Sequence, residues 1–150
     1  MGIAEYWKKF LSETGRNPDE TGFSGEMVFE GEGVVGFQRL SLVLSGKRTA
    51  SFSAFESYAL NREMIPVSGE LYIVENLDGE PCAILELTNV SVIPFYEIPW
   101  DLARRDGESA TLDEWREKMR ESLEDEGALC GFDVDEKTRV VCEIFRVIFQ

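Results

Sequence analysis

The segment Leu42-Val43-Leu44-Ser45-Gly46-Lys47-Arg48-Thr49-Ala50-Ser51 decides the fold and contains most of the predicted functional residues. Its apolar start continues a helical pattern that Gly46 can end, because glycine accepts the left-handed backbone that reverses the chain. After the two cations, hydroxyl and apolar side chains alternate, which predicts a β-strand. The hydroxyl residues stand two apart and therefore share one face of that strand: Thr49, Ser51 and Ser53.

This segment is also a basic island in an acidic chain. The 150 residues include 15 Lys and Arg against 29 Asp and Glu, a net charge of −14. Residues 37–62 carry four cations and one carboxylate, so they are locally basic. The acidic remainder repels phosphate backbones at long range, so we expect no duplex DNA partner. The island itself is either a site for an anionic or polar ligand or a set of cations paired with neighbouring carboxylates.

The rest of the chain predicts an α+β fold in one domain, residues 1–150, with an N-terminal helix. Helices do not alternate one by one with strands, which favours a mostly antiparallel sheet or small barrel. The expected elements, in order, are a helix at 3–13, an irregular wrap at 15–36 with a short strand at 27–29, a helix at 37–45, a β-like run at 47–55, a strand at 70–75, a hairpin turn at 76–79, a strand at 81–93, a loop or short helix at 95–107, a helix from the capping box Thr111–Glu114 to about 125, and a strand at 139–149.

Composition excludes several chemistries. The chain has no histidine, and its three cysteines form no CxxC pair, so Ser-His-Asp and Cys-His catalysis and the usual zinc sites are excluded. We expect no metal and no cofactor, and interpret the acidic run Glu124-Asp125-Glu126 as a frayed helix end. The apolar runs are too short to span a membrane, and we read no signal peptide, so we expect a soluble, cytoplasmic protein with no membrane partner.

The stretch LVLSGKRTAS resembles the GKKTAT-type signature of ASCH domains, which share a barrel with the PUA RNA-binding domains. The resemblance covers nearly the whole chain in order, through the motifs Glu5-Tyr6-Trp7-Lys8-Lys9-Phe10, Pro66-Val67-Ser68-Gly69, Asp78-Gly79-Glu80-Pro81, Val92-Ile93-Pro94-Phe95, Gly107-Glu108, Trp115-Arg116 and Val140-Val141-Cys142-Glu143-Ile144-Phe145. It implies a PUA-like small β-barrel with flanking helices.

The resemblance also implies a function. ASCH domains are thought to bind RNA or nucleotides in a cleft beside the signature, so we expect a nucleobase, a nucleoside or a short RNA as the ligand. Tyr58 either stacks on a base or packs in the core. The residues expected to bind the ligand are Lys47, Arg48, Thr49, Ser51, Tyr58, Glu108 and Arg116.

Two alternatives stay open. Some small family members are amidohydrolases that deacetylate acetylcytidine, and ribonuclease activity is also known. The amidohydrolase lysine, threonine and glutamate fall here on Arg48, Ser51 and Glu108, with Lys47 one residue earlier. Because arginine stays protonated and cannot act as a base, the catalytic set of this alternative is Ser51, Glu108 and Lys47. The other alternative is a peptide or protein interaction module.

Overall fold

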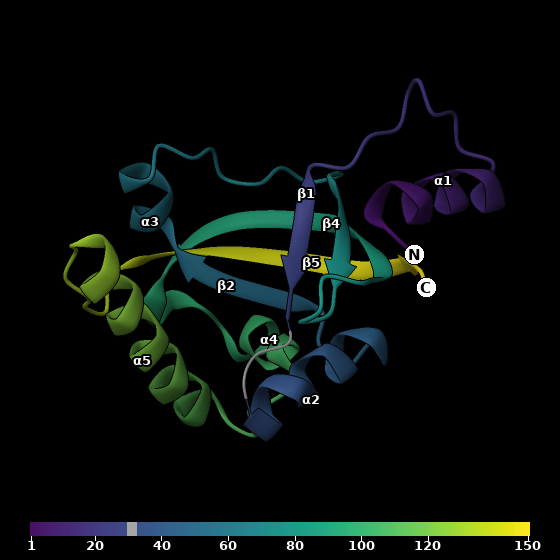
Figure 1. Cartoon of the computed structure of the whole chain (residues 1–150). Helices are drawn as coiled ribbons and strands as arrows, with labels where there is room; N and C mark the ends of the chain where they lie inside the picture. The colour runs from purple at the N-terminus through teal and green to yellow at the C-terminus, as the bar shows by residue number, and fades with distance from the viewer. Residues whose placement is uncertain (30–32) are drawn as a thin grey trace. The chain divides into compact units, whose positions relative to one another are not determined.

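The computed structural model describes residues 1–29 and 33–150, and five strands hydrogen-bond in the order β1-β3-β4-β5-β2 (Figure 1). The elements are α1 (Ile3–Thr14), β1 (Gly25–Val28), α2 (Gly33–Leu44), β2 (Ala50–Ala54), α3 (Phe55–Leu60), β3 (Leu71–Glu75), β4 (Pro81–Pro94), η1 (Phe95–Glu97), α4 (Trp100–Ala103), η2 (Arg104–Asp106), α5 (Leu112–Cys130) and β5 (Arg139–Phe149). This order confirms the predicted α+β class. Antiparallel pairing joins β2 to β5 and β3 to β4, whereas β1 pairs with β3 in parallel.

The chain divides into two compact units. The first unit comprises Met1–Arg48, Gly69–Leu87 and Phe145–Gln150, and the second comprises Thr49–Ser68 and Thr88–Ile144. Strands β4 and β5 therefore contribute residues to each unit. The single domain expected over residues 1–150 stays a prediction.

The first unit is built on α1 and the β3–β4 hairpin. The apolar stripe of α1 buries Tyr6, Phe10 and Leu11 against three strand residues, Leu71, Ile73 and Ile84. The aromatic ring of Phe149, at the end of β5, packs edge-on against Tyr6 and Phe10 at centroid distances of 5.7 and 5.4 Å. The end of β5 and the first helix therefore pack in the same core.

The second unit packs α5 against one face of β2 and of the first half of β5. Its core cluster comprises Ala54, Phe95, Ile98, Ala103, Trp115, Met119, Leu123, Val140 and Cys142. Trp115, which is 2% exposed, meets Phe52 of β2 edge-on at 5.1 Å. Trp115 is therefore a core residue, and Phe52 is partly buried against the same core.

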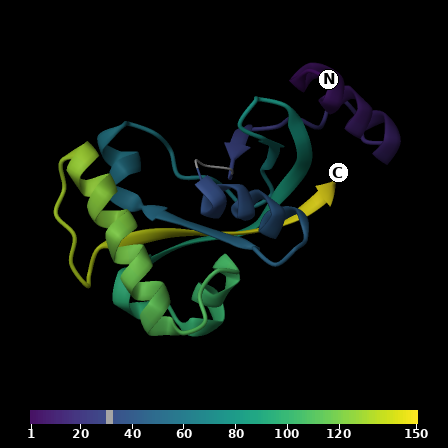
Figure 2. The same cartoon turned by 60° about the horizontal axis from the view of Figure 1, so that its bottom comes forward.

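Most predicted elements are confirmed to within a few residues, and three differ from the prediction. The predicted β-like run 47–55 stops at Ala54, and Phe55 begins α3 (Figure 2). The helix predicted to end near residue 125 continues to Cys130, so the acidic run lies inside α5 and is not a frayed end. The predicted wrap 15–36 instead contains the first turns of α2, and its residues 30–32 lie outside the described part of the chain.

Candidate functional site

The polar face of β2 carries the centre of the site. Ser51 lies directly opposite Glu143 of β5 in the antiparallel register, and Ser53 lies opposite Val141. Directly opposed residues project from the same face of a sheet, with Cβ atoms about 5 Å apart. The hydroxyls of Ser51 and Ser53 and the Glu143 carboxylate therefore share the face that α5 leaves uncovered within this unit.

Tyr58 joins this face from α3. Its hydroxyl donates to Glu143 Oε1 at 3.3 Å and lies 3.3 Å from Ser53 Oγ. Because the one phenolic proton is directed at the carboxylate, Ser53 is the donor in the second contact. Burial, the largest cause, and the nearby Glu143 carboxylate raise the pKa of Tyr58 above its ordinary value of 10.0. The phenol is thus held protonated, as a donor to Glu143.

Glu143 is the site residue that the sequence analysis did not single out. Its side chain is only 6% exposed, and buried carboxylates are rare in proteins unless they are hydrogen-bonded or functional. A signal was present in the sequence, since Glu143 is the one acid in the apolar run RVVCEIFRVIF at 139–149. A charged residue inside a buried strand pattern indicates a satisfied polar cluster, which here includes Tyr58.

Glu108 stands at the end of a tightly bonded turn. The buried carboxylate of Asp106 accepts the backbone N–H groups of Glu108 at 2.8 Å and Ser109 at 3.1 Å, and the Ser109 hydroxyl at 3.0 Å. The 106–109 turn leads directly into α5, whose first turn is capped by Thr111 Oγ1 accepting from the Glu114 N–H at 3.1 Å. The backbone around Glu108 is therefore fixed by several hydrogen bonds.

The Glu108 turn is also tied to the start of β2. The Thr49 N–H donates to the Arg105 carbonyl at 2.9 Å, and Arg105 Nη1 donates to Thr49 Oγ1 at 3.3 Å. Ser51 lies two residues beyond Thr49, and Glu108 lies three residues beyond Arg105. Within the second unit, the structure thus joins the segments that carry these two predicted catalytic residues.

Lys47 and Arg48 belong to the first unit, at the end of α2. Both backbone N–H groups donate to the Leu42 carbonyl at 3.0 Å, and Gly46 has the left-handed φ of +79° that the predicted chain reversal requires. The Lys47 side chain is exposed, and the Arg48 guanidinium lies 5.6 Å from the centroid of the Phe29 ring.

Arg116 of α5 is directed at Tyr96. Its Nη2 donates to the Tyr96 carbonyl at 3.0 Å, and its guanidinium lies 4.6 Å from the Tyr96 ring centroid. Arg120, one turn later, donates to the hydroxyl of the same tyrosine at 2.7 Å. In the structure these arginines anchor the 95–97 turn, and a role of Arg116 in ligand binding stays a prediction.

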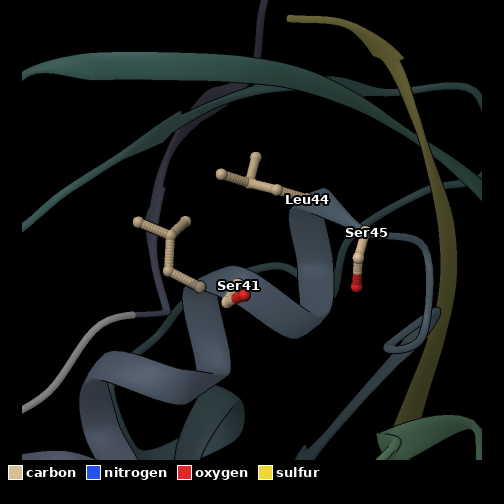
Figure 3. Close-up of a pocket in the computed structure, with 4 residues that line it drawn as sticks. Ser41, Leu44 and Ser45 are labelled. Atoms are coloured by element: carbon tan, nitrogen blue, oxygen red, sulfur yellow. The ribbon is translucent and has the colours of Figure 1, made fainter.

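Two surface hollows are formed by other described residues. One, of about 400 Å³, is lined by the last turns of α2, where the side chains of Leu44 and Ser45 point in different directions (Figure 3). The other, of about 630 Å³, lies at the C-terminal end of α5, between Glu124 and Val134. None of the predicted site residues lines either hollow.

Two properties of the described residues concern metal binding and membrane insertion. Within residues 1–29 and 33–150, no group of three or more His, Cys, Asp or Glu residues is arranged to hold a metal ion. No helix in that same part of the chain is long and apolar enough to cross a membrane.

Comparison with known proteins identifies both the fold class, a PUA-like α+β fold, and the family. The ASCH-domain profile matches residues 28–149. An ASCH domain from Lactobacillus crispatus has a TM-score of 0.87 at 29% identity, over 98% of this chain and 94% of that one. A protein from Enterococcus faecalis has a TM-score of 0.84 at 26% identity, over 98% and 88% of the two chains. No protein in the curated comparison matches. The chain belongs to the ASCH-domain family.

Proposed function

We propose that this ASCH domain binds a nucleobase, a nucleoside or a short single-stranded RNA at the polar face of β2. The observation that carries the proposal is the cluster of Ser53, Tyr58 and Glu143, which stands beside Ser51 on that face. The Lys47-Arg48 pair directly precedes this strand in the chain. Its role in ligand binding is part of the proposal.

The cluster matches the chemistry of a heterocycle edge. Nucleobases present alternating N–H donors and N or O acceptors, and a hydroxyl serves either, whereas a carboxylate accepts from an amino group. An aromatic ring beside such polar groups supports base stacking, which contributes about 1–3 kcal/mol per base. Tyr58 offers both a ring and a hydroxyl, so it suits either mode of recognition.

The overall charge favours a small ligand. At a net charge of −14, a long phosphate backbone meets repulsion over most of the surface, whereas one base or nucleoside meets only local groups. Binding dominated by phosphates weakens steeply with salt. We therefore expect a nearly salt-independent affinity for nucleosides and a modest salt dependence for a short RNA.

Titration calorimetry with cytidine, uridine, adenosine and guanosine tests the proposal. We expect one or more nucleosides to bind, Ser51→Ala and Tyr58→Ala to weaken binding, and Lys47→Ala or Arg48→Ala to weaken a nucleotide more than its nucleoside. Lys137→Ala is a matched control, since its cation stands on an exposed turn of the second unit. The absence of binding by all nucleosides and by short RNAs would contradict the proposal.

A second candidate is hydrolysis of acylated nucleosides such as acetylcytidine, and the tie between the Glu108 turn and the start of β2 favours it. In this reaction water adds to the acyl carbon, and the bond from that carbon to the exocyclic nitrogen breaks. The proton that Glu108 takes from water passes to the departing nitrogen. In this direct route Ser51 holds the water, and Lys47 supplies positive charge to the developing oxyanion. If Ser51 is instead the nucleophile, Glu108 takes the serine proton and delivers it to the departing nitrogen, and water then cleaves the acyl-serine ester and restores the Ser51 hydroxyl.

Chromatographic detection of cytidine released from acetylcytidine tests this second candidate. Hydrolysis predicts turnover that falls by at least about a hundredfold in Glu108→Gln, the scale of general acid–base catalysis. Ser51→Ala is expected to lose turnover as well. Glu114→Gln is the matched control. Glu114 lies six residues after Glu108 and accepts the Ala110 N–H at the start of α5. Nucleoside binding without turnover of acetylcytidine would contradict the hydrolase candidate and support the binding function.

A further inference from the structure

Helix α3 receives its N-terminal hydrogen bonds from a distant residue. The residue at its N-terminus, Ala54, has no side chain that can cap a helix. Instead, Glu126 Oε2 of α5 accepts the Ala54 N–H at 3.2 Å and the Ser57 hydroxyl at 2.8 Å. These contacts join residues 72 and 69 positions apart in the sequence. Both views show α3 beside the C-terminal half of α5 (Figures 1 and 2).

A helix as short as α3 depends on such support. It has six residues, and helices shorter than about 12–15 residues are marginal in water without tertiary contacts. A carboxylate at a helix N-terminus satisfies unpaired donors and interacts favourably with the helix dipole. Tyr58 follows Ser57 directly, so the position of the phenol depends on how this helix is held.

Other contacts of α3 are weaker restraints. Arg139 of β5 pairs with Glu56 at 2.6 Å and stacks on Phe55, with the guanidinium 4.2 Å from the ring centroid. Both partners of that ion pair are more than a third exposed, and such pairs contribute little and are screened by salt. Glu126 is partly buried, so its two hydrogen bonds compete less with water.

We infer that Glu126 is the positioning residue for Tyr58: its carboxylate on α5 fixes the start of α3 so that the phenol reaches Ser53 and Glu143. This inference rests on the proposed function for its role in ligand binding, but the placement of Tyr58 is measurable without a ligand. It also explains the acidic run at 124–126, where the other two carboxylates, Glu124 and Asp125, are exposed.

The chain supplies closely matched variants. Both hydrogen bonds end on the same oxygen of Glu126, so the single amide oxygen of Glu126→Gln can accept both, whereas Glu126→Ala accepts neither. Ser57→Ala removes only the 2.8 Å bond and is a milder change should Glu126→Ala not fold. Asp125→Ala deletes the adjacent exposed carboxylate and is the control for a change of net charge.

Ultraviolet titration of the tyrosines reports on the position of Tyr58, with Tyr58→Phe identifying its signal. In Glu126→Ala, and to a smaller extent in Ser57→Ala, we expect the pKa of Tyr58 to move down toward its ordinary value, because the phenol leaves its buried position. Amide exchange of α3 should accelerate about five- to tenfold, the size of a lost cap. Asp125→Ala should resemble the parent protein in both measurements. Glu126→Gln should resemble it in amide exchange and should lower the pKa of Tyr58 less than Glu126→Ala does, because it removes only the nearby Glu126 charge that helps to raise this pKa.

Binding of the best nucleoside from the calorimetric series is then measured in the same variants. We expect Glu126→Ala to lose about five- to tenfold in affinity and Glu126→Gln to restore it. Unchanged titration and exchange in both Glu126→Ala and Ser57→Ala would overturn the inference. Should no nucleoside bind the parent protein, the proposed function fails, while titration and exchange still decide whether Glu126 places Tyr58.

Discussion

Replacing Gly127 with alanine is expected to destabilise the protein although alanine is the better helix former. Gly127 is buried inside α5, where a Gly-to-Ala change gains up to about 1 kcal/mol from helix propensity. A Cβ at this position would lie 2.4 Å from the backbone oxygen of Phe132, well inside the 3.0 Å that real Cβ contacts respect. The steric cost and the propensity gain therefore oppose each other.

The steric cost should prevail because the neighbouring backbone is held in place. The N–H groups of Gly131 and Phe132 both donate to the Gly127 carbonyl, at 2.8 and 3.1 Å. Relieving the contact means moving this hydrogen-bonded turn, and overpacking of this kind costs about 1–3 kcal/mol. After a propensity gain of about 1 kcal/mol is subtracted, we expect a net loss of up to about 2 kcal/mol in the free energy of unfolding.

Urea denaturation followed by circular dichroism measures this loss. The midpoint should fall in Gly127→Ala with little change in slope, and the melting temperature should fall by about 3–6 °C. Ser122→Ala, at an exposed position of the same helix, is the control and should be neutral or slightly stabilising. If Gly127→Ala is as stable as the parent protein, the turn at Phe132 moves aside at little cost and the steric argument is wrong.

Three further predictions concern the cores and the start of α5. Tyr6 is 7% exposed and its hydroxyl has no hydrogen-bond partner in the described chain, so Tyr6→Phe should raise the free energy of unfolding by about 1 kcal/mol in urea denaturation. A loss of stability would show that the hydroxyl is satisfied. Burial raises the pKa of the Cys142 thiol to about 12, so iodoacetamide at pH 8 should modify Cys82 and Cys130 in the native protein and Cys142 only after unfolding. The unfolded thiol ionises near pH 9 and the native thiol near pH 12. The contribution of Cys142 to stability should therefore be complete below pH 9 and decline as the pH rises toward 12. Cys142→Ala should abolish this decline. Thr111→Ala removes the 3.1 Å cap of α5 and should cost about 1 kcal/mol, whereas Thr111→Ser should retain it, and equal stability of the two variants would contradict the capping role.

Local sequence predicted the features that depend on neighbouring residues. The apolar stripe at residues 3–13 predicts α1, the capping box at Thr111 predicts the start of α5, and Gly46 predicts the reversal before β2. Each depends on contacts within about four residues, where backbone preference and side-chain spacing suffice. The same applies to the two faces of β2, because alternation alone separates the hydroxyls from Phe52.

The sequence also left particular features open. Helix α3 was missed because its six residues follow a β-like run and its cap comes from Glu126, far along the chain. Glu143 was not recognised because its partner across the sheet depends on strand register. The end of α5 lies further along the chain than predicted, since the acidic run resembles a frayed terminus and local sequence does not show that Glu126 accepts hydrogen bonds from Ala54 and Ser57.

By itself, then, the amino-acid sequence determined the fold class, the family and the hydroxyl strand that follows two cations, because periodicity and short motifs act over a few residues. Only the tertiary structure decided which carboxylate stands beside that strand, which tyrosine reaches it and which acid holds that tyrosine's helix. Those pairings span about 70 to 90 residues, and they arise when β5 pairs with β2 and α5 packs beneath them.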